Sequence, residues 1–287
     1  MILKKIYWKM GFKRERFFFF LAGFFFALAG IAIGRLIFSQ NIGLVAVFLT
    51  SLAAISIVDK QISLSEILLG KIKRLPNRII FIDEILTVEH RVTLKSVYED
   101  HKYLFSTYFF LFLGIMACYS AVTIALPVEQ SSKLFGEQFE IISGQGLGPI
   151  DTFIGLITNN FFVLLTGFFL ALLFESGTTF IIVWNASVWG TAFALVTKNP
   201  WITLTSDPFI NFVFLLLLSF PHLVLEIVSY FASTIAGGLL NKAIIAENFM
   251  SIRFKIIAAH STVLFLFGLL TLLIGAAVET LVIMWLA

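Results

Sequence analysis

The chain has 287 residues, of which 59% are hydrophobic and 13% charged, and its mean hydropathy is +0.99. Soluble domains are about half apolar and about a quarter charged. One globular core of this size cannot hide 34 phenylalanines that occur in unbroken runs. The composition therefore excludes an ordinary soluble domain and predicts an all-α polytopic protein of the cell membrane.

The sequence lacks the motifs of several common classes of enzyme and binding protein. Its single cysteine, Cys118, lies in an apolar run, which excludes a disulfide framework and a cysteine-based metal site. No phosphate-binding loop, dinucleotide-binding glycine motif or HExxH zinc motif occurs. We therefore expect no cofactor, no nucleic-acid partner and no enzymatic activity.

Seven apolar segments approach the roughly 20 residues that a membrane-spanning helix needs. The first follows the basic opening MILKKIYWKMGFKRER, and its length is that of a span and not of a signal-peptide core. The sixth is too long, and Pro221 at its centre predicts a kink or a break. The predicted spans are residues 17–38, 41–58, 103–126, 153–174, 177–197, 209–238 and 262–286.

The basic residues predict the orientation of the spans. With the N-terminus in the cytoplasm, 17 of the 20 Lys and Arg residues lie on the inner side, and only Arg35, Lys133 and Lys198 lie outside. Cytoplasmic loops of membrane proteins carry such an excess. We therefore expect seven spans, a cytoplasmic N-terminus and an external C-terminus.

The spans and loops divide the chain into three parts. Residues 1–58 form a basic segment and a transmembrane hairpin, and residues 103–287 form a five-helix membrane core. Residues 59–102 alternate apolar and charged positions at helical spacing, which predicts amphipathic helices on the anionic inner leaflet. Within this segment we interpret His90 and His101 as ordinary surface histidines.

Several polar residues interrupt the predicted spans. Ionisable groups within lipid are costly and indicate a functional site by default, although asparagines and carboxylic acids also tie helices together by hydrogen bonds. The candidates are Asn159, Asn160, Glu175, Asn185, His222, Glu226 and Glu279.

The stretch SFPHLVLEIVSYF places His222 and Glu226 four residues apart, on one face of a helix. Three interpretations are open: a metal site that includes Glu279, a pair that handles protons or ions, and a structural pair. A lone histidine and carboxylate are a weak metal signal, because zinc needs three or four ligands.

Helix rise predicts the depth of each polar residue in the membrane. The result is a column, with Asn160 and Glu279 in the outer third, Asn185 and His222 in the middle, and Glu226 and Glu175 on the inner side. Such spreading favours a polar pathway or a buried network over a compact metal or catalytic centre.

Small residues predict which spans pack closely, because glycine lets helix backbones approach. They indicate that the last four spans form a tight bundle, whereas the phenylalanine-rich first span is expected to face lipid. The packing candidates are Gly167, Gly177, Gly190, Gly237 and Gly238.

Taken together, these motifs resemble the stage II sporulation protein M family of integral membrane proteins. The resemblance rests on NNFFVLLTGFFLALLFESGTTFIIVWNASVWGTA, PHLVLEIVSYFASTIAGG and IGAAVE, and it is strongest over residues 100–287. The opening hairpin is similar to that of longer, archaeal-type members. One position differs, since Leu223 follows the motif histidine where the family usually has glycine.

The resemblance implies an integral membrane protein, and its bacterial members imply a scaffold that acts with cell-wall-remodelling enzymes. We therefore expect first a non-enzymatic scaffold or a component of an envelope complex. It would have membrane-protein partners, still unidentified, or copies of itself in a homo-oligomer. The alternatives are a transporter or channel-like protein that uses the polar column and, third, an intramembrane metal-dependent hydrolase.

Overall fold

The computed structural model describes residues 2–71, 94–138, 149–174, 177–198 and 205–286. All regular secondary structure in these ranges is helical. The helices are α1 (Ile2–Ile37), α2 (Ile42–Lys71), α4 (Leu94–Ala125), α5 (Val128–Leu134), α7 (Pro149–Leu173), α8 (Gly177–Val196), α9 (Pro208–Ala246) and α10 (Ile252–Leu286).

Six helices in the described ranges are long and apolar enough to cross a membrane. Their apolar spans are Glu15–Ile37, His101–Ala125, Phe153–Leu173, Thr179–Val196, Pro208–Ala246 and Phe254–Met284. Four of them match a predicted span within a few residues at both ends. The span Pro208–Ala246 ends eight residues later than expected, and the last span begins eight residues earlier. The remaining predicted span corresponds to Ile42–Val58, the shorter apolar part of α2.

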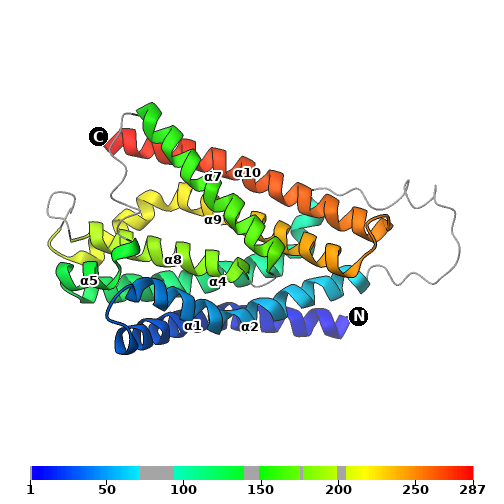
Figure 1. Ribbon diagram of the computed structural model, residues 1–287, viewed down its shortest axis with the longest axis horizontal. Helices are drawn as coiled ribbons and strands as arrows, with labels where there is room; N and C mark the ends of the chain where they lie inside the picture. Colours follow the sequence, from blue (N-terminus) through cyan, green and yellow to red (C-terminus); the bar gives the residue numbers. More distant parts are fainter. Residues whose placement is uncertain (1, 72–93, 139–148, 175–176, 199–204, 287) are drawn as a thin grey trace, which may run out of the picture.

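The path of the chain shows how α2, whose apolar part is short, fits into the bundle. The start of α1 and the end of α10 lie at opposite ends of the bundle in Figure 1, and α2 runs back beside α1. The hairpin turns at Asn41, which has a positive φ of 54°, a conformation that asparagine tolerates better than most residues. A chain whose two termini lie at opposite ends of a bundle passes along that bundle an odd number of times. Helix α2 is one of these passes.

The long helix α9 is continuous, so of the kink or break predicted at Pro221 the break is wrong. Asp207 caps its start by accepting a hydrogen bond from the Phe209 N–H at 2.8 Å, and Pro208 occupies the first turn. The helix bends along its length in Figure 1. Pro221 cannot bond the carbonyl of Leu217 four residues before it, and both residues are exposed on the outer side of the bundle.

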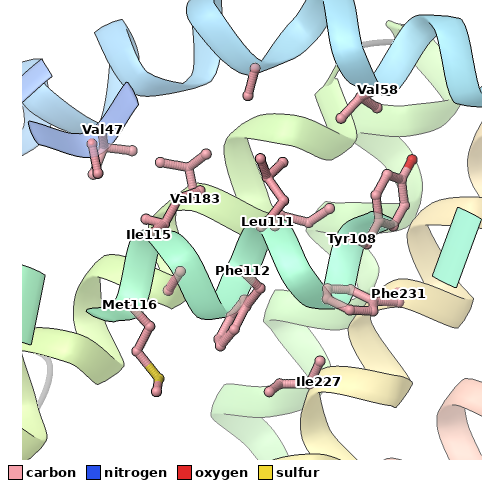
Figure 2. Close-up of a cluster of buried hydrophobic side chains, with 14 of the residues drawn as sticks. Val47, Val58, Tyr108, Leu111, Phe112, Ile115, Met116, Val183, Ile227 and Phe231 are labelled. Carbon is pink, nitrogen blue, oxygen red and sulfur yellow. The ribbon is translucent and has the colours of Figure 1, made fainter. Parts of the chain in front are cut away.

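Helix α4 lies at the centre of the apolar core. Figure 2 shows its side chains directed toward α2, α8 and α9. The rings of Tyr108 and Phe231 meet edge to face at 5.5 Å, and Phe112 meets Trp189 at 6.0 Å. Since Leu111 and its neighbours in this core are fully buried, α4 joins the N-terminal hairpin to the C-terminal helices.

The sequence predicted that the first span faces lipid, but only one face of helix α1 does so. A Cβ atom on Gly114 of α4 would lie 2.0 Å from the carbonyl oxygen of Phe20, and one on Gly23 would lie 2.4 Å from that of Leu111. The two backbones therefore touch. Phenylalanines such as Phe17 and Phe25 are exposed, so α1 has one packed face and one apolar outer face.

The predicted packing glycines behave in two ways. At four of the five, a Cβ atom would come within 3.0 Å of a neighbour, and the neighbours are Thr234 Cγ2 for Gly167, Leu170 O for Gly177, Met116 O for Gly190 and Phe168 O for Gly237. The exception is Gly238, where a Cβ atom would meet nothing within 4 Å. The packing role predicted for Gly238 is therefore wrong.

A lysine that follows helix α8 caps the C-terminal end of α4. The Lys198 ammonium, just after α8, donates to the carbonyl oxygens of Thr123 and Leu126. These carbonyls have no partner within the helix, and a cation at a helix C-terminus also opposes the negative end of the dipole. Partial burial lowers the pKa of Lys198.

We predict that the C-terminus lies outside the cytoplasm, because the excess of basic residues lies on the N-terminal side. A reporter enzyme that is active only outside the cytoplasm should be active when fused after Ala287. The same reporter inserted at residue 85 should be inactive. Inactivity at the C-terminus would show that α2 does not cross the membrane.

The neighbouring glycines of α9 give a second prediction. Gly237→Ala should lower the melting temperature in detergent, because its Cβ would lie 2.2 Å from the Phe168 oxygen and would force α7 away from α9. Gly238→Ala is the matched control and should be neutral or stabilising, since alanine is favoured over glycine within a helix by about 0.5–1 kcal/mol. Equal melting temperatures for the two variants would contradict this packing.

Candidate functional site

Helices α7, α9 and α10 are fastened together by side chains that bond to neighbouring backbones. Ser233 of α9 donates to the Leu164 carbonyl of α7 at 2.7 Å, and Asn241 donates to that of Leu172 at 2.6 Å. From α10, Ser261 donates to the Ala236 carbonyl at 2.8 Å. These hydrogen bonds fix the positions of the three helices relative to one another along the axis of the bundle.

This arrangement brings three of the predicted polar residues together. The Asn160 side-chain amide of α7 donates to Glu226 Oε1 of α9 at 2.6 Å. The Glu226 carboxyl also lies close enough to Glu279 of α10 for the two acids to interact. We name these three residues the carboxyl centre. Glu226 is 4% exposed and Asn160 is 6% exposed, whereas Glu279 is half-buried.

The contact between the two acids has a chemical consequence. An ionised carboxylate can only accept hydrogen bonds, so a bond between two carboxyl groups requires a proton on one of them. Two ionised carboxylates at this separation would repel one another strongly. Two carboxyl groups that approach one another can avoid this repulsion by sharing a proton or by binding a cation between them.

The surroundings of the carboxyl centre are mainly apolar. Tyr230 lies one turn after Glu226 and is buried with Leu164 and Leu272. Gly275 of α10 lies beside this part of α9, since a Cβ atom there would be 3.3 Å from Leu225 Cβ and 3.5 Å from Glu226 Cγ. A low-dielectric environment strengthens the hydrogen bonds of the centre and makes an unpaired charge there expensive.

The predicted column of polar residues is therefore wrong for this group. Asn160 and Glu279 were expected in the outer third and Glu226 on the inner side, yet they meet. The prediction let α7 and α9 enter the membrane at residues 153 and 209, which are 56 positions apart. The observed contacts join residues 69 positions apart, so α9 extends beyond the start of α7. Charge and hydropathy do not encode that offset.

The other predicted candidates lie outside this group. The amide of Asn185 donates to the Ile181 carbonyl of its own helix at 2.8 Å. Asn159 is exposed and bonds the side chain of Asn160 at 3.3 Å. His222 is buried, with no partner for Nδ1 among the described groups. Glu175 and His90 lie outside the described residues.

The metal interpretation finds no ligand set in the described part of the chain. There, no group of three histidine, cysteine, aspartate or glutamate side chains is close enough to hold a metal ion. His222, Glu226 and Glu279 therefore do not form the site that was weighed for them. Although His222 and Glu226 share a helix face in sequence, Glu226 finds its partners on α7 and α10 instead.

One buried pair was missed by the sequence analysis. His101, predicted as a surface residue, is fully buried, and its ring lies 6.1 Å from that of His260. Helix α4 begins at Leu94, so His101 already lies inside the bundle, where α4 packs against α10. His260 escaped notice because the last span begins before the position expected for it.

The fold and the carboxyl centre define a polytopic helical membrane protein with a buried acidic site. The family model for stage II sporulation protein M matches residues 106–282, which is more than half of the chain. The protein thus belongs to the stage II sporulation protein M family, as its motifs suggested. The matched region contains all three residues of the carboxyl centre. Searches of curated proteins and of solved structures give no significant match.

Asn160 and Asn159 provide a matched test of the site. Asn160→Leu should destabilise the protein by about 1–3 kcal/mol, because Glu226 would lose a buried donor. Asn159→Leu should be close to neutral, since that side chain is exposed. Thermal unfolding of both variants in the same detergent measures the difference. If both variants unfold at the wild-type temperature, the Asn160–Glu226 bond contributes nothing to stability.

Proposed function

We propose that this protein is a transporter or channel-like protein in which the carboxyl centre binds a proton or a small cation. The observation that carries the proposal is that buried Glu226 and half-buried Glu279, which come from different helices, meet. The proposal involves no covalent chemistry.

The cost of the two acids argues against a purely structural role. A charged residue at the centre of a span opposes insertion by about 2.5–3.5 kcal/mol even on the lenient insertion scale. A glutamine at position 226 could accept the same bond from Asn160 without that cost. Two carboxyl groups add the ability to gain or lose a proton, which an amide lacks.

The position of the centre also suits ion handling. Glu226 is almost fully enclosed, whereas Glu279 is half-buried, so the pair extends from the interior toward the surface of the bundle. Pro221 lies in α9 five residues before Glu226, and proline removes one hydrogen bond of the helix there. A change in the helix at that point would alter how the centre is exposed.

The second candidate is the non-enzymatic scaffold that the sequence placed first. It is supported by the bonds of Ser233, Asn241 and Ser261 to neighbouring backbones, which make a rigid bundle. In this case the carboxyl centre would be one more fastening between helices. The two candidates predict different behaviour for the same variants.

Glu226→Gln separates the two candidates. It keeps the size of the side chain and an acceptor for Asn160, so its melting temperature in detergent should stay near that of the wild type. In proteoliposomes carrying an imposed potential and an internal pH-sensitive dye, the wild type should move protons, or a cation when sodium or potassium is supplied. Glu226→Gln should reduce that flux to the level of protein-free liposomes.

The controls define the contrary outcome. Glu129→Gln, an exposed acid of α5, should leave the flux unchanged. Glu226→Leu should lower the melting temperature, because Asn160 and Glu279 would both lose a partner. Wild-type protein that moves none of these ions, together with a stable Glu226→Gln variant, would leave the scaffold as the function.

A further inference from the structure

A groove near the start of the apolar spans of α1 and α4 shares no lining residue with the carboxyl centre. It has a volume of about 580 Å³ and lies between α1, α4, α9 and α10. This volume is within the range of about 300–1,000 Å³ that is usual for ligand pockets. The groove is formed by helices that are distant in sequence, and no predicted site residue lines it.

The walls of the groove are apolar and aromatic. Five of its ten lining residues are phenylalanines, among them Phe109 of α4, Phe231 of α9 and Phe267 of α10. A valine, a leucine and Ser106 complete this part of the lining. Most of these side chains are half-buried, so the groove is a recess in the outer surface of the bundle. Such a surface accommodates a hydrocarbon chain.

The remaining two lining residues are cations. Arg16 stands at the beginning of the apolar span of α1, and Lys102 at the beginning of that of α4. The two helices run parallel, so both cations lie where apolar helix gives way to the membrane surface. The Arg16 guanidinium lies 5.7 Å from the centre of the Phe110 ring, which keeps it at the groove. No acidic side chain is among the described lining residues.

We infer that this groove binds an anionic phospholipid, with its phosphate at Arg16 and Lys102 and an acyl chain against the phenylalanines. The apolar walls and the paired cations match the two parts of such a lipid. Both cations belong to the side that the basic residues identify as cytoplasmic, where anionic lipids attract Lys and Arg. A lipid seated there would be wedged between α4 and the α9–α10 pair.

Photo-crosslinking of the full-length protein tests this inference. In detergent, phosphatidylglycerol with a photoreactive acyl chain should label peptides containing Phe109 or Phe231. Unlabelled phosphatidylglycerol should compete for this labelling, and phosphatidylcholine should compete much less. Equal competition by the two lipids, or labelling spread evenly over the helices, would overturn the proposal.

Variants separate the headgroup site from the chain site. Arg16→Gln and Lys102→Gln should each weaken the preference for phosphatidylglycerol by about fivefold, since each cation near an anionic surface contributes about 1 kcal/mol. Arg35→Gln is the matched control, because Arg35 is exposed near the opposite end of α1. Native mass spectrometry of the lipid-bound protein measures the preference.

A groove-filling variant tests the same site without altering charge. Ser106→Phe should reduce the occupancy of the groove by both lipids, because the added ring would fill the space between the phenylalanines. Labelling of the wild type needs no variant, so a folding defect in one of them does not affect the test. Undiminished binding by Ser106→Phe, or by Arg16→Gln with Lys102→Gln, would show that lipid does not occupy the groove. An unrelated peptide or a second copy of the chain would then be its occupant.

Discussion

The need to satisfy a carboxyl group inside an apolar bundle governs the C-terminal half of this protein. Glu226 is 4% exposed, and a buried polar group needs hydrogen-bond partners. It accepts a hydrogen bond from Asn160 of α7 and lies close to Glu279 of α10. Each partner comes from a different helix. The register of all three helices is therefore tied to this centre, and a shift of one turn would leave a buried acid without a partner.

Contact between backbones provides the second constraint. Lipid gives no hydrophobic force that drives apolar helices together, so association depends on close packing and on polar contacts. Gly114 and Gly237 allow α1 to touch α4 and α9 to touch α7. Where the backbones approach, Ser233 can reach the Leu164 carbonyl. Close packing and polar fastening therefore occur together along α7 and α9.

The carboxyl centre and the lipid groove share two helices but have opposite chemistry. The carboxyl centre joins two acids and an asparagine from α7, α9 and α10, while the groove is an aromatic recess with two cations. Phe231 of the groove lies five residues after Glu226 on α9. A lipid between α4 and α9 would therefore contact the same helix that carries Glu226. Helix α9 thus connects the groove, which faces the membrane, with the carboxyl centre.

The sequence alone determined the helical membrane class, the approximate ends of the spans and the identity of the costly polar residues, because hydropathy and charge act locally along the chain. The sequence also contains the motifs that indicated the stage II sporulation protein M family, and the family model confirms that membership. It did not determine that Asn160, Glu226 and Glu279 meet, that His101 is buried or that a Cβ atom on Gly238 would meet no neighbour. Those facts depend on how far α9 is displaced along α7 and how it bends, and packing between helices sets both.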